Sequence, residues 1–170
     1  LPRKTVSELV HLLQNEGDLK IYAKEGLAIF DIGNVILTSK LIDSVYPNYR
    51  QVTPESCTER INVDRQLLLS ALDRASVMTM EESNSIRLTF ESNQLIVSSR
   101  AAEVGEVRDI VPIKYDGAKI DIVFNPNYVM DPLKAIDEDE ITMELNDGTK
   151  PALIKCSVPF LYVMMPLRIN

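Results

Sequence analysis

One helical segment followed by three strand-like segments recurs along the chain about every 50 residues, and this repeat constrains the fold more than any single motif. Apolar residues at helical spacing predict a helix over 5–16, and short alternating runs predict the strands that follow it. The same order returns twice more, each time opened by one additional strand. The expected strands are 19–24, 27–32 and 34–42, then 58–63, 85–91, 94–100 and 106–115, then 119–124, 140–146, 151–157 and 160–167.

This order predicts an α+β protein made of one αβββ unit and two βαβββ units. The first unit lacks the opening strand of the other two, which would leave an unpaired sheet edge. The chain also opens on Leu1, without a methionine or a basic and apolar leader. We therefore expect that the natural protein begins upstream of this residue.

Local signals predict where the helices begin. Thr5 and Glu8 have the spacing of a capping box, and Asp64 suits the N-cap of a second helix that runs to about residue 78. Pro126 suits the first turn of a third helix. Pro132 falls inside that helix, where its missing N–H group predicts a kink or a break. The stripe expected to be buried on the second helix consists of Leu68, Leu69, Leu72 and Ala75.

A polar segment with two prolines, residues 46–54, is typical of a connector between domains. We place the boundary at Glu55, which gives domains 1–55 and 56–170. The whole chain has 18 Lys and Arg residues against 25 Asp and Glu residues, a net charge of −7. Six basic and seven acidic residues fall in the first domain, and 12 against 18 in the second. This balance argues against a surface that binds nucleic acid everywhere, although it permits a local basic patch.

The residue types needed for catalysis do not come together in any recognisable pattern. His11 is the only histidine, and its place on a helix favours a surface residue over a member of a catalytic triad. The acidic run 137–140 lacks the spaced ligands and the glycine of a calcium loop, so a solvated turn is favoured over a metal site. No glycine-rich phosphate-binding motif is present. We expect a binding or scaffolding protein without cofactor or metal, rather than an enzyme.

Cys57 and Cys156 lie far apart and match neither a disulfide framework nor a metal-binding pattern, which favours a reducing, cytoplasmic environment. The apolar run 160–166 is far shorter than the roughly 20 residues needed to cross a bilayer. We therefore expect no membrane partner.

Two surface features leave alternatives open. Basic residues recur near the first two helices and on the strand after the second. The simpler interpretation is a solvated helix face, and the more specific one is contact with phosphate groups. The apolar tail 161–170 fits a last buried strand, but its methionines also suit an adaptable groove for partner peptides.

Several motifs, in the same order and spacing, resemble those of the bacterial DNA polymerase III β subunits, the replicative sliding clamps. The segment Tyr-Pro-Asn-Tyr-Arg and the ending Val-Met-Met-Pro-Leu-Arg are specific in combination. The segments that carry the resemblance are 1–4, 30–33, 37–43, 46–50, 124–125, 128–131 and 162–168.

The resemblance implies a DNA clamp fold. In that family each protomer has three similar domains, each a pair of βαβββ units, and two protomers close head to tail into a homodimeric ring around duplex DNA. The chain then corresponds to half of the middle domain, followed by a complete C-terminal domain. The implied function is that of a non-catalytic processivity factor in the cytoplasm, associated with the nucleoid. Its implied partners are double-stranded DNA, the DNA polymerase III catalytic subunit, the clamp loader and other clamp-binding proteins.

The resemblance also implies a pocket for short partner peptides between the middle and last domains. Gln51 and Pro151 depart from residues found in some relatives, which would alter peptide preference. The family's other pocket wall has no counterpart in this sequence, so we expect impaired affinity. The matching positions are Pro47, Gln51, Val52, Asn125, Tyr128, Pro151, Val163, Met164, Met165, Pro166, Leu167 and Arg168.

Two further surfaces are implied. The DNA-facing positions would be Arg3, Lys4, Arg74 and Arg87, whereas Asn84 stands where many relatives add a basic residue. The ring interface would use an apolar contact with an acidic flank, from which Arg108 departs. Its positions are Val77, Met78, Glu103, Glu106 and Asp109.

Two hypotheses of other classes remain at this stage. The first is an enzyme whose active site lies in the missing N-terminal part. The second is an interaction module that self-associates through an apolar sheet face.

Overall fold

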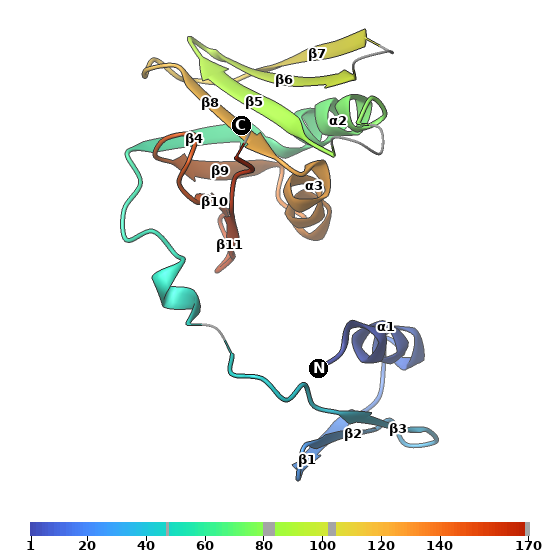
Figure 1. The fold of residues 1–170 in the computed structure, drawn as a ribbon. Helices are drawn as coiled ribbons and strands as arrows, with labels where there is room; N and C mark the ends of the chain where they lie inside the picture. The colour runs from blue at the N-terminus through green and yellow to red at the C-terminus, as the bar shows by residue number, and fades with distance from the viewer. Residues whose placement is uncertain (47, 80–83, 102–104, 169–170) are drawn as a thin grey trace. The chain divides into compact units, whose positions relative to one another are not determined.

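A computed structural model describes residues 1–46, 48–79, 84–101 and 105–168. It divides into two compact units, Leu1–Pro47 and Asn48–Asn170. Figure 1 shows the elements of each unit. Among the described residues, no helix is long and apolar enough to span a membrane.

The first unit consists of one helix and one antiparallel sheet. Helix α1 (Arg3–Leu12) precedes the strands β1 (Lys20–Lys24), β2 (Leu27–Asp31) and β3 (Ile36–Lys40), which pair in sequence order. The unit buries few of its described residues, and Val10, Ile21 and Ile36 are each more than 60% exposed. An unusual amount of apolar surface is therefore open on this unit.

The capping box predicted at the start of α1 is wrong. The helix begins two residues earlier, at Arg3, and its N-cap residue Pro2 makes no side-chain capping hydrogen bond. The Thr5 hydroxyl instead shares a 2.7 Å hydrogen bond with the hydroxyl of Ser39 on β3. Thr5 therefore connects the helix to the sheet, although the local pattern predicts that it caps the helix.

The second unit begins with the 3₁₀ helix η1 (Tyr49–Gln51) and contains two βαβββ repeats. The first repeat is formed by β4 (Glu59–Asp64), α2 (Arg65–Ser76), β5 (Ile86–Glu91), β6 (Gln94–Ala101) and β7 (Gly105–Pro112). The second is formed by β8 (Ile120–Phe124), α3 (Pro126–Ala135), β9 (Glu140–Leu145), β10 (Ala152–Lys155) and β11 (Leu161–Met164). The repeat that the sequence predicts is confirmed, with shifts at the ends of several elements.

Each repeat gives its first strand to the sheet of the other repeat. The sheets have the orders β11-β10-β9-β4 and β7-β6-β5-β8, so β4 completes the second sheet and β8 the first. All described strand pairs are antiparallel. This exchange ties the two repeats into one structure, because neither four-stranded sheet forms from one repeat alone.

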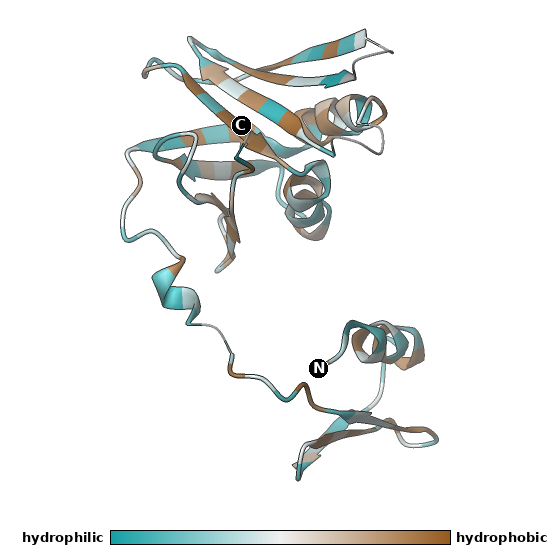
Figure 2. Ribbon diagram, in the orientation of Figure 1, coloured by the Kyte–Doolittle hydropathy of each residue, from teal (hydrophilic) through white to brown (hydrophobic). Residues whose placement is uncertain are grey.

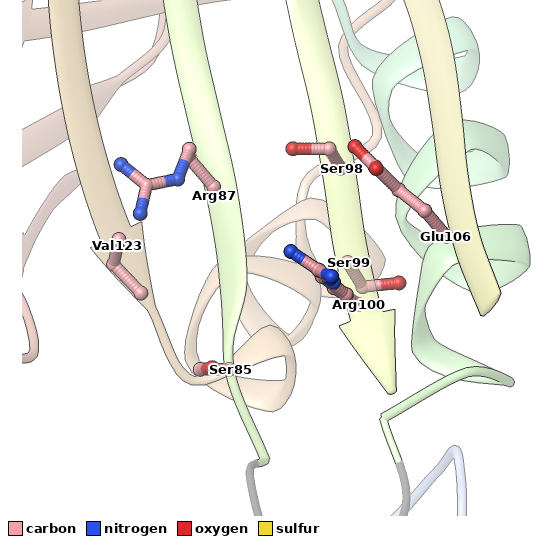
Figure 3. Close-up of a pocket in the computed structure, with 7 residues that line it drawn as sticks. All are labelled: Ser85, Arg87, Ser98, Ser99, Arg100, Glu106 and Val123. Atoms are coloured by element: carbon pink, nitrogen blue, oxygen red, sulfur yellow. The ribbon is translucent and has the colours of Figure 1, made fainter. Parts of the chain in front are cut away.

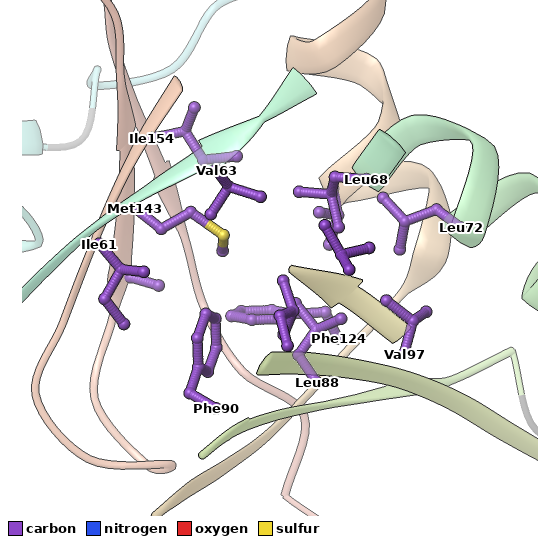
Figure 4. Close-up of a cluster of buried hydrophobic side chains, with 14 of the residues drawn as sticks. Ile61, Val63, Leu68, Leu72, Leu88, Phe90, Val97, Phe124, Met143 and Ile154 are labelled. Carbon is purple, nitrogen blue, oxygen red and sulfur yellow. The ribbon is translucent and has the colours of Figure 1, made fainter. Parts of the chain in front are cut away.

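The core lies between the two sheets and the two helices. Helix α2 packs against α3 and against strands of both sheets, and α3 also contacts β11. Hydrophobic and hydrophilic residues alternate along β5 (Figure 2), and Leu88 and Phe90 of this strand are fully buried. Figure 4 shows these two side chains with Leu68 of α2, Phe124 of β8 and Met143 of β9. All five are fully buried, so both repeats contribute to one shared core.

Helix α2 starts and packs largely as its sequence predicts. The Asp64 side chain accepts a 2.8 Å hydrogen bond from the Leu67 N–H group, which confirms the predicted N-cap. The buried stripe differs at one position, since Ala71 is fully buried and Leu69 only half-buried.

Pro132 does not break α3, so the predicted break at this position is wrong. The helix continues from Pro126 to Ala135, and the Ile136 N–H group donates to the Pro132 carbonyl at 3.1 Å. Proline removes one N–H donor that would otherwise bond the Tyr128 carbonyl. The Pro132 ring is buried, and the apolar contact it gains there offsets this local loss.

Candidate functional site

An exposed apolar corner lies where α3 meets β11 and the residues after it. Tyr128 on α3 is 55% exposed, and Met165 and Leu167 after β11 are 57% and 40% exposed. The Leu167 N–H group donates a 2.7 Å hydrogen bond to the Val123 carbonyl, which ties the tail to the end of β8. The corner therefore presents apolar side chains on a backbone that is held in place.

Alternation along β11 separates two residues that the resemblance places together in the pocket. Met164 pairs with Ala152 and is only 2% exposed, so its side chain packs in the hydrophobic core. Val163 pairs with Leu153 and points to the opposite face of the strand. Pro151 directly precedes β10 and is half-exposed. Met164 therefore belongs to the core next to the corner and does not line its surface.

The start of α3 is fixed by Asn125, whose side-chain oxygen accepts a 3.0 Å hydrogen bond from the Asn127 N–H group. Asn125 therefore orients the helix that carries Tyr128. Pro166 is half-exposed and Arg168 is exposed at the end of the described tail. These two residues lie in the same segment as Met165 and Leu167.

Tyr162 is a neighbour of this corner that the sequence analysis does not include among the pocket residues. Burial raises the pKa of its hydroxyl above the usual 10.0, and the charges of Asp131 and Tyr128 add to that shift. This agrees with the contact between β11 and α3. The spacing of Tyr128 and Asp131 places them on one face of the helix, but it does not indicate that Tyr162 lies against that face.

The remaining pocket candidates lie on the connector. Gln51 ends η1, and Val52 follows it as the C-cap and is 51% exposed. The Asn48 side chain accepts a 3.2 Å hydrogen bond from the Arg50 N–H group and so shapes the start of this turn. Pro47 lies outside the described residues. The connector residues therefore belong to an element separate from the apolar corner.

The four candidate DNA-facing residues are divided between the two units, and the two in the second unit lie on different faces. Arg3 and Lys4 are exposed in the first turn of α1, in the first unit. Arg74 lies on α2, whereas Arg87 lies on β5 between the fully buried Ile86 and Leu88. Because neighbouring strand residues point to opposite faces, the Arg87 side chain points away from the core and from α2. Arg74 and Arg87 therefore lie on opposite sides of the same sheet.

An ion pair joins one DNA-facing candidate to one ring-interface candidate. The Arg74 Nε atom donates to the Asp109 Oδ2 atom of β7 at 2.5 Å. This hydrogen bond lowers the pKa of the Asp109 carboxyl from its usual 3.8, and burial opposes part of the shift. The pair links the outer flank of α2 to the edge strand of the sheet.

The lowered pKa predicts a pH-dependent stability. The contribution of Asp109 is complete above its unfolded-state pKa near 3.8 and is lost as the pH falls through the lower folded-state value. The loss should be about 1 kcal/mol or less, because the Arg74 side chain is 59% exposed. Urea unfolding at pH 7 and pH 3 should show a smaller loss on acidification for Asp109→Asn than for the unchanged chain. Equal losses in both proteins would contradict this assignment.

The other ring-interface candidates lie around the same edge. Val77, directly after α2, is 77% exposed, and Met78 beside it is half-buried. Glu106 lies on β7, and α2 packs against this strand. Glu103 lies outside the described residues. An exposed apolar residue and two acidic residues thus flank the free edge of the β7-β6-β5-β8 sheet.

The acidic run 137–140 is engaged in holding the start of α2. The Arg65 side chain donates to the Glu138 carbonyl at 2.5 Å and to the Leu133 carbonyl at 3.0 Å. The Arg65 N–H group donates to the Asp139 carbonyl at 2.9 Å. Within the described ranges, no group of three or more His, Cys, Asp or Glu side chains is arranged to hold a metal ion.

Comparison with protein families gives matches over nearly the whole chain. The model for the central domain of the DNA polymerase III beta subunit matches residues 1–48. The model for the C-terminal domain of the same subunit matches residues 50–168. The two matches follow each other in domain order.

Individual relatives agree with the family models. The beta sliding clamp of Haemophilus influenzae is 34% identical over 99% of this chain and 47% of its own length. The beta sliding clamp of Escherichia coli K12 is 32% identical over 99% of this chain and 47% of its own length. The chain therefore spans about half the length of the curated relatives it matches.

Solved structures show the same fold. The DNA polymerase sliding clamp of Pseudomonas aeruginosa, solved with a ligand, has a TM-score of 0.90 and 30% identity. The sliding clamp of Bartonella birtlesii bound to griselimycin has a TM-score of 0.91 and 35% identity. Each comparison covers 99% of this chain and 47% of the solved chain. The α+β clamp fold, with part of a middle domain followed by a C-terminal domain, is thus confirmed, and the chain belongs to the DNA polymerase III beta subunit family.

Proposed function

We propose that this chain is part of a non-catalytic sliding clamp, the processivity factor of a bacterial replicative polymerase. The observation that carries the proposal is the match of two consecutive clamp domain models to residues 1–48 and 50–168. The exposed apolar side chains of the first unit also fit this assignment, because half of a two-repeat domain needs a second half to cover them. The site of action would be the cytoplasm, in association with the nucleoid.

The clamp would hold the polymerase by enclosing double-stranded DNA in a head-to-tail homodimeric ring. Encirclement requires no base contacts, and a modest positive potential toward the phosphates is sufficient. Arg3 and Lys4 are exposed on α1 and suit this role. Arg74 is exposed on α2 but is paired with Asp109, so only its remaining N–H groups would contact phosphate. Arg87 would contact DNA only from the opposite side of its sheet. The flank of Val77, Met78, Glu106 and Asp109 would form the ring interface.

The apolar corner would bind the DNA polymerase III catalytic subunit, the clamp loader and other clamp-binding proteins through short peptide segments. Tyr128, Met165 and Leu167 expose apolar surface, and the half-exposed Val163 of β11 lies two residues before Met165. Aromatic and methionine side chains are frequent anchors in such interfaces, since they bury a large area and adapt in shape. Gln51 and Val52 would complete the pocket from the connector.

Peptide titration of the chain tests the docking site. A fluorescent peptide with the clamp-binding segment of a bacterial replicative polymerase should bind, and Tyr128→Ala and Met165→Ala should each raise the Kd about tenfold. The control is Ile110→Ala, which removes a 53% exposed side chain from β7 and should leave the Kd within about twofold. Unchanged affinity in both corner variants would contradict this docking site.

A further inference from the structure

The face of the β7-β6-β5-β8 sheet that points away from α2 collects three arginines. Arg87 of β5 pairs in register with Ser98 of β6, and Ser98 pairs with Arg108 of β7. Arg87, Ser98 and Arg108 therefore form one row across three strands, with the serine hydroxyl between two guanidinium groups. Arg100 lies two residues beyond Ser98 and so shares the same face. We call Arg87, Ser98, Arg100 and Arg108 the arginine face.

These guanidinium groups have no protein partner within the described part of the chain. All three arginines are exposed, and the ion pairs that the described residues form involve other cations. Lys119 on the same sheet face differs, since it pairs with Glu91 at 3.9 Å and with Asp121 at 3.7 Å. The arginine face is thus the part of this sheet surface where positive charge is unmatched.

The surface is also hollowed at this point. A depression of about 380 Å³ is lined by Arg87, Arg100, Ser98, Glu106 and neighbouring residues. Figure 3 shows the side chains of Arg87, Ser98 and Arg100 around it, with Glu106 on the neighbouring strand. Glu106 is the register partner of Arg100, and it also lines a second depression with Arg87 and Arg108. Glu91, Asp121 and Lys119 line that second depression too. The residues around the two depressions thus include four basic and three acidic side chains, a small positive excess.

We propose that the arginine face binds an acidic peptide segment of a partner protein. Arginine recognises carboxylates through paired N–H donors, and the Ser98 hydroxyl adds a donor between them. Strands lie ~4.8 Å apart, so Arg87 and Arg108 are anchored ~10 Å from each other. Alternate side chains of an extended peptide are spaced ~7 Å apart. The long, flexible arginine side chains can span the difference between this spacing and the ~10 Å between their own anchor points. An extended segment with alternating carboxylates therefore fits the row.

Charge favours an acidic peptide over duplex DNA on this face. Residues 56–170 carry 12 basic and 18 acidic residues, so a long polyanion that extends beyond the arginine face would meet a surface that repels it. A short acidic segment would contact only the arginine face. The arginine face adjoins the apolar corner at Val123, which pairs in register with Arg87 and accepts the hydrogen bond from the Leu167 N–H group. Its own residues lie on β5, β6 and β7, whereas those of the corner lie on α3 and after β11.

Fluorescence anisotropy tests the proposal. The probe is a fluorescein-labelled peptide of alternating glutamate and serine, titrated with the chain at low ionic strength. The unchanged chain should bind it, and Arg87→Ser combined with Arg108→Ser should raise the Kd at least about tenfold. The matched control combines Arg60→Ser with Lys24→Ser, which removes the same charge from exposed positions elsewhere and should change the Kd less than about threefold.

A second pair of variants tests the geometry. Arg87→Lys combined with Arg108→Lys keeps the charge but removes the planar paired donors, so the Kd should be intermediate. Circular dichroism confirms that each variant is folded. The proposal is overturned if the peptide does not bind, if the control loses as much affinity as the serine variant, or if duplex DNA binds through these arginines while the peptide does not.

Discussion

Replacing Leu68 with alanine is expected to lower the free energy of unfolding of the second unit by about 3–5 kcal/mol. Leu68 is fully buried on α2, where it lies among core side chains from both sheets. The substitution removes apolar contacts and leaves a cavity, because residues packed by two sheets and two helices collapse only in part. Urea unfolding followed by circular dichroism measures the change.

Leu67→Ala provides a matched control for this experiment. It makes the same substitution at the neighbouring position of the same helix, but Leu67 is 49% exposed. Its cost should stay below about 1 kcal/mol, since it creates no cavity and alanine favours the helix. Similar costs for the two variants would show that α2 does not face the shared core in this way.

Replacing Gly148 with alanine should lower stability by about 1–3 kcal/mol, the range found when a close-packed site is overfilled. Gly148 lies in the turn between β9 and β10, and an added methyl group would overlap the backbone carbonyl oxygen of Asp121 on β8. A backbone atom cannot move aside as a flexible side chain does. The turn, the β8 strand or both must therefore shift, which loosens the contact between the two sheets.

A substitution elsewhere in the turn between β9 and β10 should be less costly than one at the contact of Gly148 with Asp121. Lys150→Ala in the same turn removes only the exposed end of a 3.4 Å ion pair with Asp147, so it should leave the free energy of unfolding nearly unchanged. The same unfolding experiment compares the two variants. A Gly148→Ala protein as stable as the Lys150→Ala protein would mean that the turn does not approach β8 so closely.

The order of elements could be predicted from the sequence because each element leaves a local signal. Apolar spacing located α2, and the alternation of Ile86, Leu88 and Phe90 located β5. The exchange of β4 and β8 between the sheets leaves no such signal, since it joins residues far apart in the chain. The start of α1 also escaped prediction, because the Thr5 hydroxyl bonds Ser39 on β3 instead of capping the helix.

The site shows the same division between local and tertiary information. The sequence could have placed Arg87 on the face opposite the core, since Ile86 and Leu88 on either side of it follow a strand alternation. The resemblance alone grouped it with Arg74 on α2. Met164 offered no local signal, because the run 160–166 is apolar on both faces. Only the pairing of β11 with β10 shows that Met164 is buried while Met165 is exposed.

The most direct test of the clamp assignment is to map where a polymerase segment binds this chain. Amide signals of the isotope-labelled chain would be followed by nuclear magnetic resonance while the clamp-binding segment of a bacterial replicative polymerase is added. The account predicts that the shifts concentrate in α3 around Tyr128 and in the β11 segment from Val163 to Leu167. Shifts confined to other surfaces, or no shifts at saturating peptide, would contradict it.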